Sequence, residues 1–319
     1  MVRLVLIDGN AILHRAYHAL PLWRNQQGEA TNGIYGFFSI LLKVRDEFKP
    51  QYLVVTFDHP SPTFRHIAYV GYQHTRVKDR QIEEDIWGQL EKLRRSLESI
   101  GVAVFQLEGF EADDLLGTLS HQAVSTKKNS LDEVIIVTGD RDLLQLVNDK
   151  IHVLLPERGL SDTLLLDEKG VLQKMGVPPN NIVQYKGLVG DTSDNYPGVP
   201  GIGPKTAVML LTEYGSIENI YKHLNSKKSK KASVLTPPII EKLIQGHEGS
   251  VISCKLATIR KDVPLSLELQ KAKMPSDDSL VSLFRGMNYL SLVKRITGES
   301  EVIKERPKKD KAKGQIELI

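Results

Sequence analysis

The chain has 319 residues, of which 41% are hydrophobic and 25% are charged. This composition is typical of a folded protein with one large or two modest domains, and it excludes a disordered chain and a collagen-like one. The single cysteine, Cys254, can form neither an internal disulfide bond nor a thiolate metal cluster, so we expect a reducing compartment. Because Asp8 interrupts the apolar start and no apolar run is long enough to span a membrane, we expect a cytoplasmic protein with no membrane partner.

The charges are nearly balanced in number but unevenly distributed. Lys and Arg number 42 and Asp and Glu number 39, which gives a net charge of +3. Residues 304–313 contain six basic and two acidic residues, so this segment alone carries +4. We expect residues 299–319 to form a flexible basic tail. Most charge runs are simply solvated, so the tail does not by itself predict a nucleic-acid partner.

The first half of the chain alternates strand and helix patterns. Strands are predicted at residues 3–7, 52–57, 102–107 and 134–138, because each run is short, apolar and rich in β-branched residues. Helices are predicted at residues 33–48, 81–100 and 112–125. This alternation predicts an α/β fold, with a mostly parallel sheet flanked by helices, over residues 1–170. Short helical stretches separated by Pro and Gly then predict an α-helical domain over residues 171–298.

Acidic residues follow the predicted strands. In an open α/β sheet, ligands bind beyond the carboxyl ends of the strands. The carboxylates at these positions, or in the Gly-rich turn GDTSDNYPG, are Asp8, Asp58, Glu111, Asp113, Asp114, Asp140, Asp142, Asp191 and Asp194. If the predicted sheet forms, these nine side chains converge on one edge.

Each of these carboxylates alone has a simpler explanation, because acidic residues commonly cap helices or favour the first helical turn. The whole set is not explained in this way, since crowded like charges raise one another's pKa unless a cation neutralises them. Oxygen ligands without His or Cys favour Mg²⁺ or Mn²⁺ over zinc. Two such ions can hold the attacking and leaving oxygens of a phosphodiester. The pattern therefore predicts metal-assisted phosphodiester hydrolysis.

Residues 198–207, GVPGIGPKTA, have the glycine spacing of a helix–hairpin–helix. Gly201 and Gly203 let the main chain approach a phosphate, the following helix directs N–H groups at it, and Lys205 adds a positive charge. Thr206 belongs to the same helical turn and completes the predicted contacts. Such contacts hold duplex DNA without reading its sequence. The simpler alternative is an ordinary Gly-Pro turn between helices.

Five motifs stand in a characteristic order: LIDGNAILHRAYHA, VVTFDH, GFEADDLLGTL, VTGDRDLLQLV and GDTSDNYPGVPGIGPKTA. Over about residues 1–298 the chain resembles the 5′-nuclease domain of bacterial DNA polymerase I and its free-standing relatives in the flap endonuclease superfamily. The resemblance implies a PIN-like nuclease core with a helical arch at about residues 62–95. It also implies a helix–hairpin–helix at about residues 185–215 that holds the downstream duplex, usually with a bound K⁺ ion.

The resemblance also implies roles for individual residues. The nine carboxylates match the acidic site of the family, which holds two or more Mg²⁺ or Mn²⁺ ions. Arg15 matches an arginine that lies near the phosphates. In the arch, Tyr72 and Arg76 match the family pattern, and Arg76 with Arg15 is expected to steady the scissile phosphate.

One position departs from the family pattern. Gln73 stands where the family commonly has a lysine, so it brings no charge to the phosphate. Arg76 and Arg80 share a face with Gln73 if this stretch is helical, so they can compensate, and Lys78 is a further candidate for DNA binding. Equally, a residue on a tolerant segment can change without functional meaning.

The last five residues, QIELI, resemble the short motif by which bacterial replication proteins bind the sliding clamp. Gln315, Leu318 and Ile319 are the expected clamp contacts. A flexible tether with a few apolar anchors raises the local concentration of its partner. A chance pentapeptide is the alternative, because such short motifs recur in unrelated proteins.

The sequence thus predicts a structure-specific 5′ nuclease that removes 5′ flaps and 5′-terminal nucleotides, including RNA primers at junctions, in replication and repair. The main alternative is a catalytically weakened DNA-junction-binding protein of the same fold, which only Gln73 favours. A sequence-specific DNA-binding regulator is disfavoured, because no recognition-helix motif is present.

Overall fold

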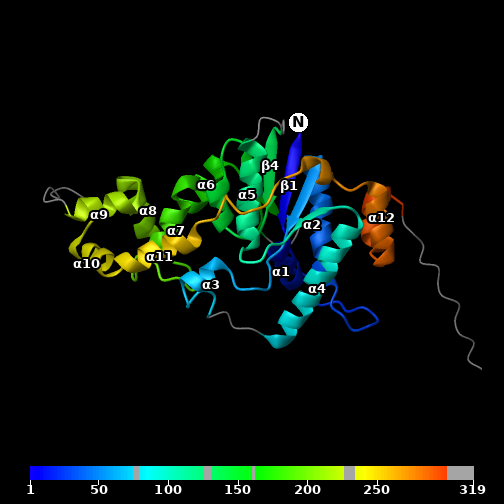
Figure 1. Ribbon diagram of the computed structural model, residues 1–319, viewed down its shortest axis with the longest axis horizontal. Helices are drawn as coiled ribbons and strands as arrows, with labels where there is room; N and C mark the ends of the chain where they lie inside the picture. Colours follow the sequence, from blue (N-terminus) through cyan, green and yellow to red (C-terminus); the bar gives the residue numbers. More distant parts are fainter. Residues whose placement is uncertain (75–78, 126–130, 158, 160–161, 226–233, 300–319) are drawn as a thin grey trace, which may run out of the picture. The chain divides into compact units, whose positions relative to one another are not determined.

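The computed structural model describes residues 1–74, 79–125, 131–157, 159, 162–225 and 234–299 (Figure 1). The chain divides into a first unit, Met1–Pro275, and a second unit that begins at Ser276. The expected domain boundary at about residue 170 falls within the first unit and stays a prediction. Within the described residues, no helix is both long enough and apolar enough to cross a membrane.

A six-stranded sheet forms the centre of the first unit. Its strands are β1 (Arg3–Asp8), β2 (Tyr52–Thr56), β3 (Ala103–Phe105), β4 (Glu133–Val137), β5 (Ile151–Pro156) and β6 (Thr163–Leu166). The strand order is β3-β2-β1-β4-β5-β6, and only the pairing of β5 with β6 is antiparallel. The chain therefore reverses its direction of travel across the sheet between β1 and β4, which is where open sheets of this kind bind ligands.

The four predicted strands are present, and the central ones are buried as their apolar sequences require. In β1, Leu4 to Ile7 are fully buried, and β2 and β4 have the same pattern. The sequence analysis did not predict β5 and β6. His152 and Pro156 interrupt the apolar pattern of β5, and β6 is a four-residue edge strand with exposed leucines, so neither gives a clear strand signal.

The helices of the first half of the chain alternate with its strands. They are α1 (Gly9–Ala19), α2 (Asn32–Phe48), α3 (Phe64–Ala68), α4 (Arg80–Ser99) and α5 (Ala112–Ser125). The 20-residue α4 is amphipathic: Ile86, Leu90, Leu93 and Leu97 are buried, and charged residues occupy its other face.

The second half of the first unit is helical after β6. Its helices are α6 (Glu168–Met175), α7 (Ile182–Val189), α8 (Pro204–Tyr214), α9 (Ile217–Asn225), α10 (Pro237–Gln245) and α11 (His247–Ala257). Figure 1 shows α7 to α11 grouped together beyond α6, on the side of the sheet away from α2 and α4. Small residues allow close packing there: a Cβ on Gly187 of α7 would lie 2.2 Å from the Cys254 sulfur of α11.

The second unit contains α12 (Asp277–Gly286) and α13 (Leu290–Thr297). Ser276 caps α12, because its hydroxyl accepts a hydrogen bond from the Ser279 N–H at 3.2 Å. The turn between the two helices closes with the Tyr289 N–H donating to the Phe284 carbonyl at 2.8 Å.

The condition under which Gln73 and Arg80 would share a helical face is not met. Residues 71–74 form a turn, and Gln73 has a left-handed backbone conformation with a φ of 55°. The next helix, α4, begins only at Arg80, so Gln73 and Arg80 do not share a helical face. Helical spacing therefore cannot make Arg80 a substitute for the missing lysine.

Candidate active site

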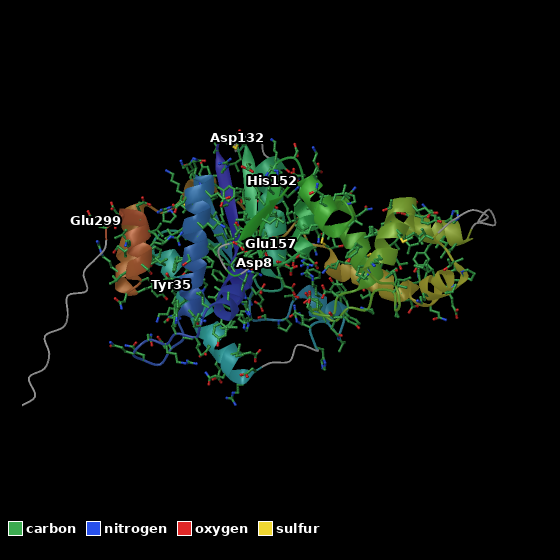
Figure 2. All side chains as sticks on the ribbon, turned by 180° about the vertical axis from the view of Figure 1, so that it is seen from behind. Asp8, Tyr35, Asp132, His152, Glu157 and Glu299 are labelled. Atoms are coloured by element: carbon green, nitrogen blue, oxygen red, sulfur yellow. The ribbon has the colours of Figure 1, made fainter. Side chains whose placement is uncertain are left out.

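Three acidic residues follow neighbouring strands at the same end of the sheet. Asp8 is the last residue of β1, and Asp58 and Asp140 come two and three residues after the ends of β2 and β4. Figure 2 shows Asp8 at the opposite end of the sheet from Asp132, which lies beside the start of β4. The site is therefore at the carboxyl end of the parallel strands.

The carboxylates line a hollow of about 440 Å³ at this end of the sheet, which we call the acidic hollow. Its acidic members are Asp8, Asp58, Glu111, Asp113, Asp140 and Asp194. The structure thus brings six of the nine predicted carboxylates to one surface, from segments spread over 187 residues of sequence. Tyr72 and Gln73 also line it, on the side formed by the stretch between β2 and α4.

Thr138 positions two of these carboxylates through hydrogen bonds. The Thr138 hydroxyl donates to Asp8 Oδ2 at 2.9 Å and accepts a hydrogen bond from the Asp140 N–H at 3.0 Å. Asp8 also caps α1, because its Oδ1 accepts from the Ala11 N–H at 2.9 Å. The capping role proposed for Asp8 as a simpler alternative is therefore present, and it leaves Asp8 in the wall of the hollow.

The stretch between β2 and α4 fixes Glu111. The Thr63 hydroxyl donates to Glu111 Oε1 at 3.0 Å, and the Tyr72 hydroxyl and an Arg65 N–H each donate to Oε2 at 3.1 Å. Asp58 lies nearby and accepts a hydrogen bond from the N–H of Ala112, the first residue of α5, at 2.8 Å. The start of α5 is thereby attached to the end of β2.

Asp114 does not line the acidic hollow. It is fully buried, and both of its oxygens accept hydrogen bonds from the Arg65 guanidinium, at 2.7 and 2.9 Å. Asp114 also accepts a hydrogen bond from the Arg260 N–H at 2.9 Å. The Arg65 guanidinium thus pairs with the Asp114 charge, and the expected part of Asp114 in metal binding stays a prediction.

Three further carboxylates form a compact group that we call the acidic triad: Asp142, Asp191 and Asp194. One oxygen from each lies within 4.8 Å of the others. Lys186 of α7 inserts its ammonium group between two of them, at 2.5 Å from Asp142 Oδ1 and in hydrogen-bonding contact with Asp191 Oδ2. Tyr196 closes the group by donating its hydroxyl proton to Asp142 Oδ2 at 3.1 Å.

Burial and crowding raise the pKa of several of these groups. Burial, with the charge of Asp58 next in importance, raises the pKa of Asp8 to about 7. Burial likewise raises the pKa of Glu111 to about 7. The pKa of Asp113 lies well above its usual range because of burial and the nearby charges of Asp140, Asp8 and Asp58.

The triad differs because Lys186 partly compensates its charge. Burial alone would raise the pKa of Asp191, but hydrogen bonds from Lys186 and Ser193 outweigh it and lower that pKa. Asp142 lies closer to Asp140, so burial and that second charge raise its pKa to about 7 despite Lys186. Burial would lower the pKa of Lys186 itself, but Asp142 and Asp191 raise it, so Lys186 stays charged.

A hard divalent cation fits this donor set. The acidic side chains of the acidic hollow and the acidic triad offer carboxylate oxygens, which suit Mg²⁺ or Mn²⁺, and His14, His59 and His66 also line the hollow. A cation bound among Asp8, Asp58, Asp113 and Asp140 would reduce the repulsion between these carboxylates. This repulsion contributes to the raised pKa values of Asp8 and Asp113.

The predicted DNA contacts of the arch stretch have mixed placements. Tyr72 is buried, with its ring against His66 and its hydroxyl on Glu111, so it supports the acidic hollow from inside. Gln73 lines the hollow, and its N–H donates to the Asp194 carbonyl at 2.9 Å. Arg80 lies on the surface at the start of α4 and pairs with Glu84 at 3.0 Å.

Arg15 lines a second, larger hollow of about 880 Å³ beside the acidic one. Its guanidinium donates to the Glu157 carbonyl at 2.6 Å and to the Gly159 carbonyl at 3.3 Å. Arg141 and Lys186 line the same hollow, and we therefore call it the basic hollow. Asp140 lines both hollows, so they adjoin.

Two glycines of the hairpin between α7 and α8 have positive φ angles. Gly198 and Gly201 have φ values of 58° and 81°, which only glycine adopts without strain. Gly201, Gly203 and Lys205 are exposed where α8 begins, and Thr206 is half-buried behind them. This surface offers main chain, a helix N-terminus and one ammonium group.

Some predicted residues lie outside the described part of the chain. They are Arg76 and Lys78 of the arch stretch and Gln315, Leu318 and Ile319 of the tail.

The sequence analysis missed several residues that position the carboxylates, among them Thr63, Arg65, Thr138, Lys186 and Tyr196. Arg65 lies in a stretch with no metal or catalytic pattern, and its partners Glu111 and Asp114 are more than 45 positions away. Lys186 precedes Asp191 by five residues, a spacing that brings the two together only because the chain turns after α7. A basic residue shortly before an acidic turn was the available signal, and it is a weak one.

Two family models match the chain. A 5′-3′ exonuclease N-terminal resolvase-like domain matches residues 3–176, and a 5′-3′ exonuclease C-terminal SAM fold matches residues 177–279. Among curated relatives, DNA polymerase I of Bacillus caldotenax is 37% identical over 300 residues, and that of Thermus aquaticus is 36% identical over 291. These matches cover 93% and 91% of this chain but 33% and 32% of the relatives, so the chain spans about a third of their length.

Solved structures share the fold at low sequence identity. T5 5′-exonuclease with bound zinc ions matches with a TM-score of 0.65 and 18% identity, over 94% of this chain and 100% of that one. The catalytic core of Rad2 in complex with a DNA substrate matches with a TM-score of 0.57 and 17% identity, over 92% and 91% of the two chains. Both confirm the predicted α/β architecture with a helical part.

Proposed function

Because the chain belongs to the 5′-3′ exonuclease family, we propose that it is a structure-specific nuclease that hydrolyses DNA phosphodiesters at 5′ flaps and 5′ ends. One observation carries the proposal: six carboxylates from separate segments line one hollow at the carboxyl end of the sheet. Crowded in this way, they repel one another, and a divalent cation relieves that repulsion.

The acidic residues divide into two groups of metal ligands in this proposal. Asp8, Asp58, Glu111, Asp113 and Asp140 hold one cation in the acidic hollow, and Asp142, Asp191 and Asp194 hold a second. Divalent ions supply Lewis-acid stabilisation and a more acidic bound water, and we propose Mg²⁺ or Mn²⁺ for this role. The protein's own part is to fix the ligands, through Thr138 for Asp8 and Asp140 and through Arg65 and Tyr72 for Glu111.

The hairpin ahead of α8 binds the DNA duplex at a second place, apart from the site of hydrolysis. Exposed Gly201, Gly203 and Lys205 offer main chain and charge to duplex phosphates, and Thr206 completes the turn. A K⁺ ion at this hairpin is part of the proposal. Arg15 and Arg76 steady the strand near the scissile phosphate, and Lys78 and Arg80 guide it.

The structure-specific assay is cleavage of a labelled double-flap DNA. We expect cleavage at the base of the 5′ flap in Mg²⁺ or Mn²⁺, and none with chelator. A second substrate with RNA at the 5′ end tests primer removal in replication and repair. If neither substrate is cleaved in Mg²⁺ or in Mn²⁺, the nuclease proposal is rejected.

A second candidate function is DNA-junction binding with weakened catalysis, and Gln73 favours it. In the acidic hollow this residue brings no charge where the family commonly has a lysine. The same assay separates the two candidates, because a junction-binding protein would shift the labelled DNA in a gel without cutting it.

We also propose that the C-terminal QIELI binds the sliding clamp, with Gln315, Leu318 and Ile319 as contacts, in the cytoplasm near the nucleoid. A chain ending at Lys313 should lose retention on immobilised clamp. Equal retention of the two chains would reject this partner.

A further inference from the structure

Lys186 occupies a position that a metal ion would otherwise take. Its ammonium nitrogen lies 2.5 Å from Asp142 Oδ1 and contacts Asp191 Oδ2, and these carboxylates form the acidic triad with Asp194. The Lys186 side chain is only 13% exposed, so this charge is held inside the group. No comparable ammonium lies among the described residues that line the acidic hollow.

A divalent cation and the Lys186 ammonium cannot share this space. Both are positive, and the other oxygens of these carboxylates already accept hydrogen bonds, Asp142 Oδ2 from Tyr196 and Asp191 Oδ1 from Ser193. A divalent ion that binds the triad must therefore displace Lys186. Its affinity is lowered by the free energy needed to separate Lys186 from the two carboxylates.

The basic hollow provides a place for the displaced side chain. Lys186 lines this hollow of about 880 Å³ together with Arg15 and Arg141. The hollow adjoins the acidic one, because Asp140 lines both. A DNA strand that leaves the acidic hollow would bring its next phosphates here, and a phosphate would receive the ammonium group in place of the carboxylates.

We propose that Lys186 is a built-in counter-ion of the acidic triad, which a divalent cation displaces into the basic hollow, where it binds a phosphate of the DNA. Lys186 remains protonated throughout, and only its partners change. DNA and the triad cation then strengthen each other's binding, because each gains from the same movement. This inference rests on the proposed function for its DNA step, whereas its metal step stands without DNA.

The metal step is tested by titrating the full chain with Mn²⁺ in the absence of DNA and measuring the bound Mn²⁺ by electron paramagnetic resonance. Because Lys186 competes for the triad, the triad should be the weaker of the two Mn²⁺ sites. We expect Lys186→Met to raise the Mn²⁺ affinity of this weaker site at least about tenfold. Lys174→Met is the matched control, since it also removes one ammonium from an ion pair, with Glu157 at 2.7 Å, which includes no carboxylate of the triad. Equal Mn²⁺ affinities in the wild type and Lys186→Met would overturn the proposal.

A second measurement uses the wild-type chain and does not depend on a variant that folds. Acetylation of lysines, read by mass spectrometry, should find Lys186 protected in chelator and reactive in Mn²⁺, while Lys174 reacts equally in both. Continued protection of Lys186 in saturating Mn²⁺ would overturn the proposal.

The DNA step is tested with a duplex that carries nuclease-resistant phosphorothioate linkages at its 5′ ends. It should tighten the weaker Mn²⁺ binding in the wild type severalfold, and it should not do so in Lys186→Met. Equal tightening in both would reject the phosphate step. If the wild type releases Lys186 in Mn²⁺ but cuts no flap, the proposed function fails alone; if it cuts flaps while Lys186 stays protected, only this inference fails.

Discussion

The acidic hollow and the hairpin ahead of α8 offer different kinds of groups to DNA. The hollow presents charged side chains, fixed by hydrogen bonds such as those of Thr138 and Arg65, on segments that follow strands. The hairpin presents main chain and one exposed lysine, Lys205. The comparison teaches that turnover should depend on individual carboxylates, whereas affinity should be spread over contacts that a single substitution weakens only slightly.

The largest effect should come from Asp140→Ala. Asp140 lines both hollows and accepts a hydrogen bond from the Asp142 N–H at 2.7 Å, so its loss disturbs both groups of carboxylates. We expect single-turnover cleavage to fall by roughly 10²–10³-fold or more. DNA affinity, measured by gel shift in Ca²⁺, should stay within about threefold. Normal turnover would contradict the assignment of this residue.

Gln73→Lys should have a smaller effect, and it should raise the cleavage rate. The substitution places an ammonium in the wall of the acidic hollow, where charge develops on the phosphate. Single-turnover flap cleavage should become roughly three- to tenfold faster. Gln73→Met, which has similar length and no charge, is the control and should leave the rate unchanged. A Lys variant that is no faster than the Met variant would show that the missing charge does not limit the reaction.

Lys205→Ala should change binding and leave chemistry intact. Loss of one phosphate contact should weaken duplex affinity severalfold at low salt and reduce the slope of log K against log salt by about 0.9. The cleavage rate at saturating DNA should not change. Lys222 of α9, which pairs with Glu218, offers the control substitution Lys222→Ala. A lower saturated rate for Lys205→Ala would break the division between hollow and hairpin.

The smallest effect concerns the metal-free protein and its pH dependence. The pKa values of Asp8 and Glu111 rise from 3.8 and 4.5 to about 7, so the folded chain binds more protons than the unfolded chain between about pH 4 and 7. Stability contributed by these groups is present at low pH and is lost as the pH rises through 7. The melting temperature in chelator should therefore fall between pH 5 and pH 8.

Two additions sharpen this prediction. Asp113→Asn removes one charge from the crowded group, so it should raise the melting temperature in chelator at pH 8 by ~2–4 °C, the shift that about 1 kcal/mol produces in a domain of 150–250 residues. Mg²⁺ should raise the wild-type melting temperature more at pH 8 than at pH 5, since protonated carboxylates bind cations poorly. A wild-type melting temperature in chelator that rises with pH would contradict the crowding of these charges.

The sequence predicted the parts of the fold whose patterns are local. Buried strands such as residues 3–7 and amphipathic helices such as α4 have clear periodicity, and acidic residues at strand ends follow from the rule for parallel sheets. β5 and β6 were missed, because a histidine and a proline, or exposure at the sheet edge, disrupt their apolar pattern.

The partners of the acidic residues could not be predicted in the same way. Nothing in the local sequence separates Asp113, which lines the acidic hollow, from its neighbour Asp114, which is buried against Arg65. Successive residues on a helix point in different directions, and which one meets an arginine 49 positions away depends on tertiary packing. The pairing of Lys186 with the triad escaped prediction for the same reason.

The contacts of Arg65 have a consequence for the order in which the site is assembled during synthesis. Its guanidinium donates to the Leu256 carbonyl at 2.8 Å, a contact that spans 191 positions, and the Arg260 N–H binds Asp114 beside it. A nascent chain that has emerged from the ribosome only as far as α5 carries Thr63, Arg65 and Tyr72, which donate to Glu111, but it lacks the main chain that seats Arg65. The site is therefore completed only after residues 256–260 have been synthesised, well after α5.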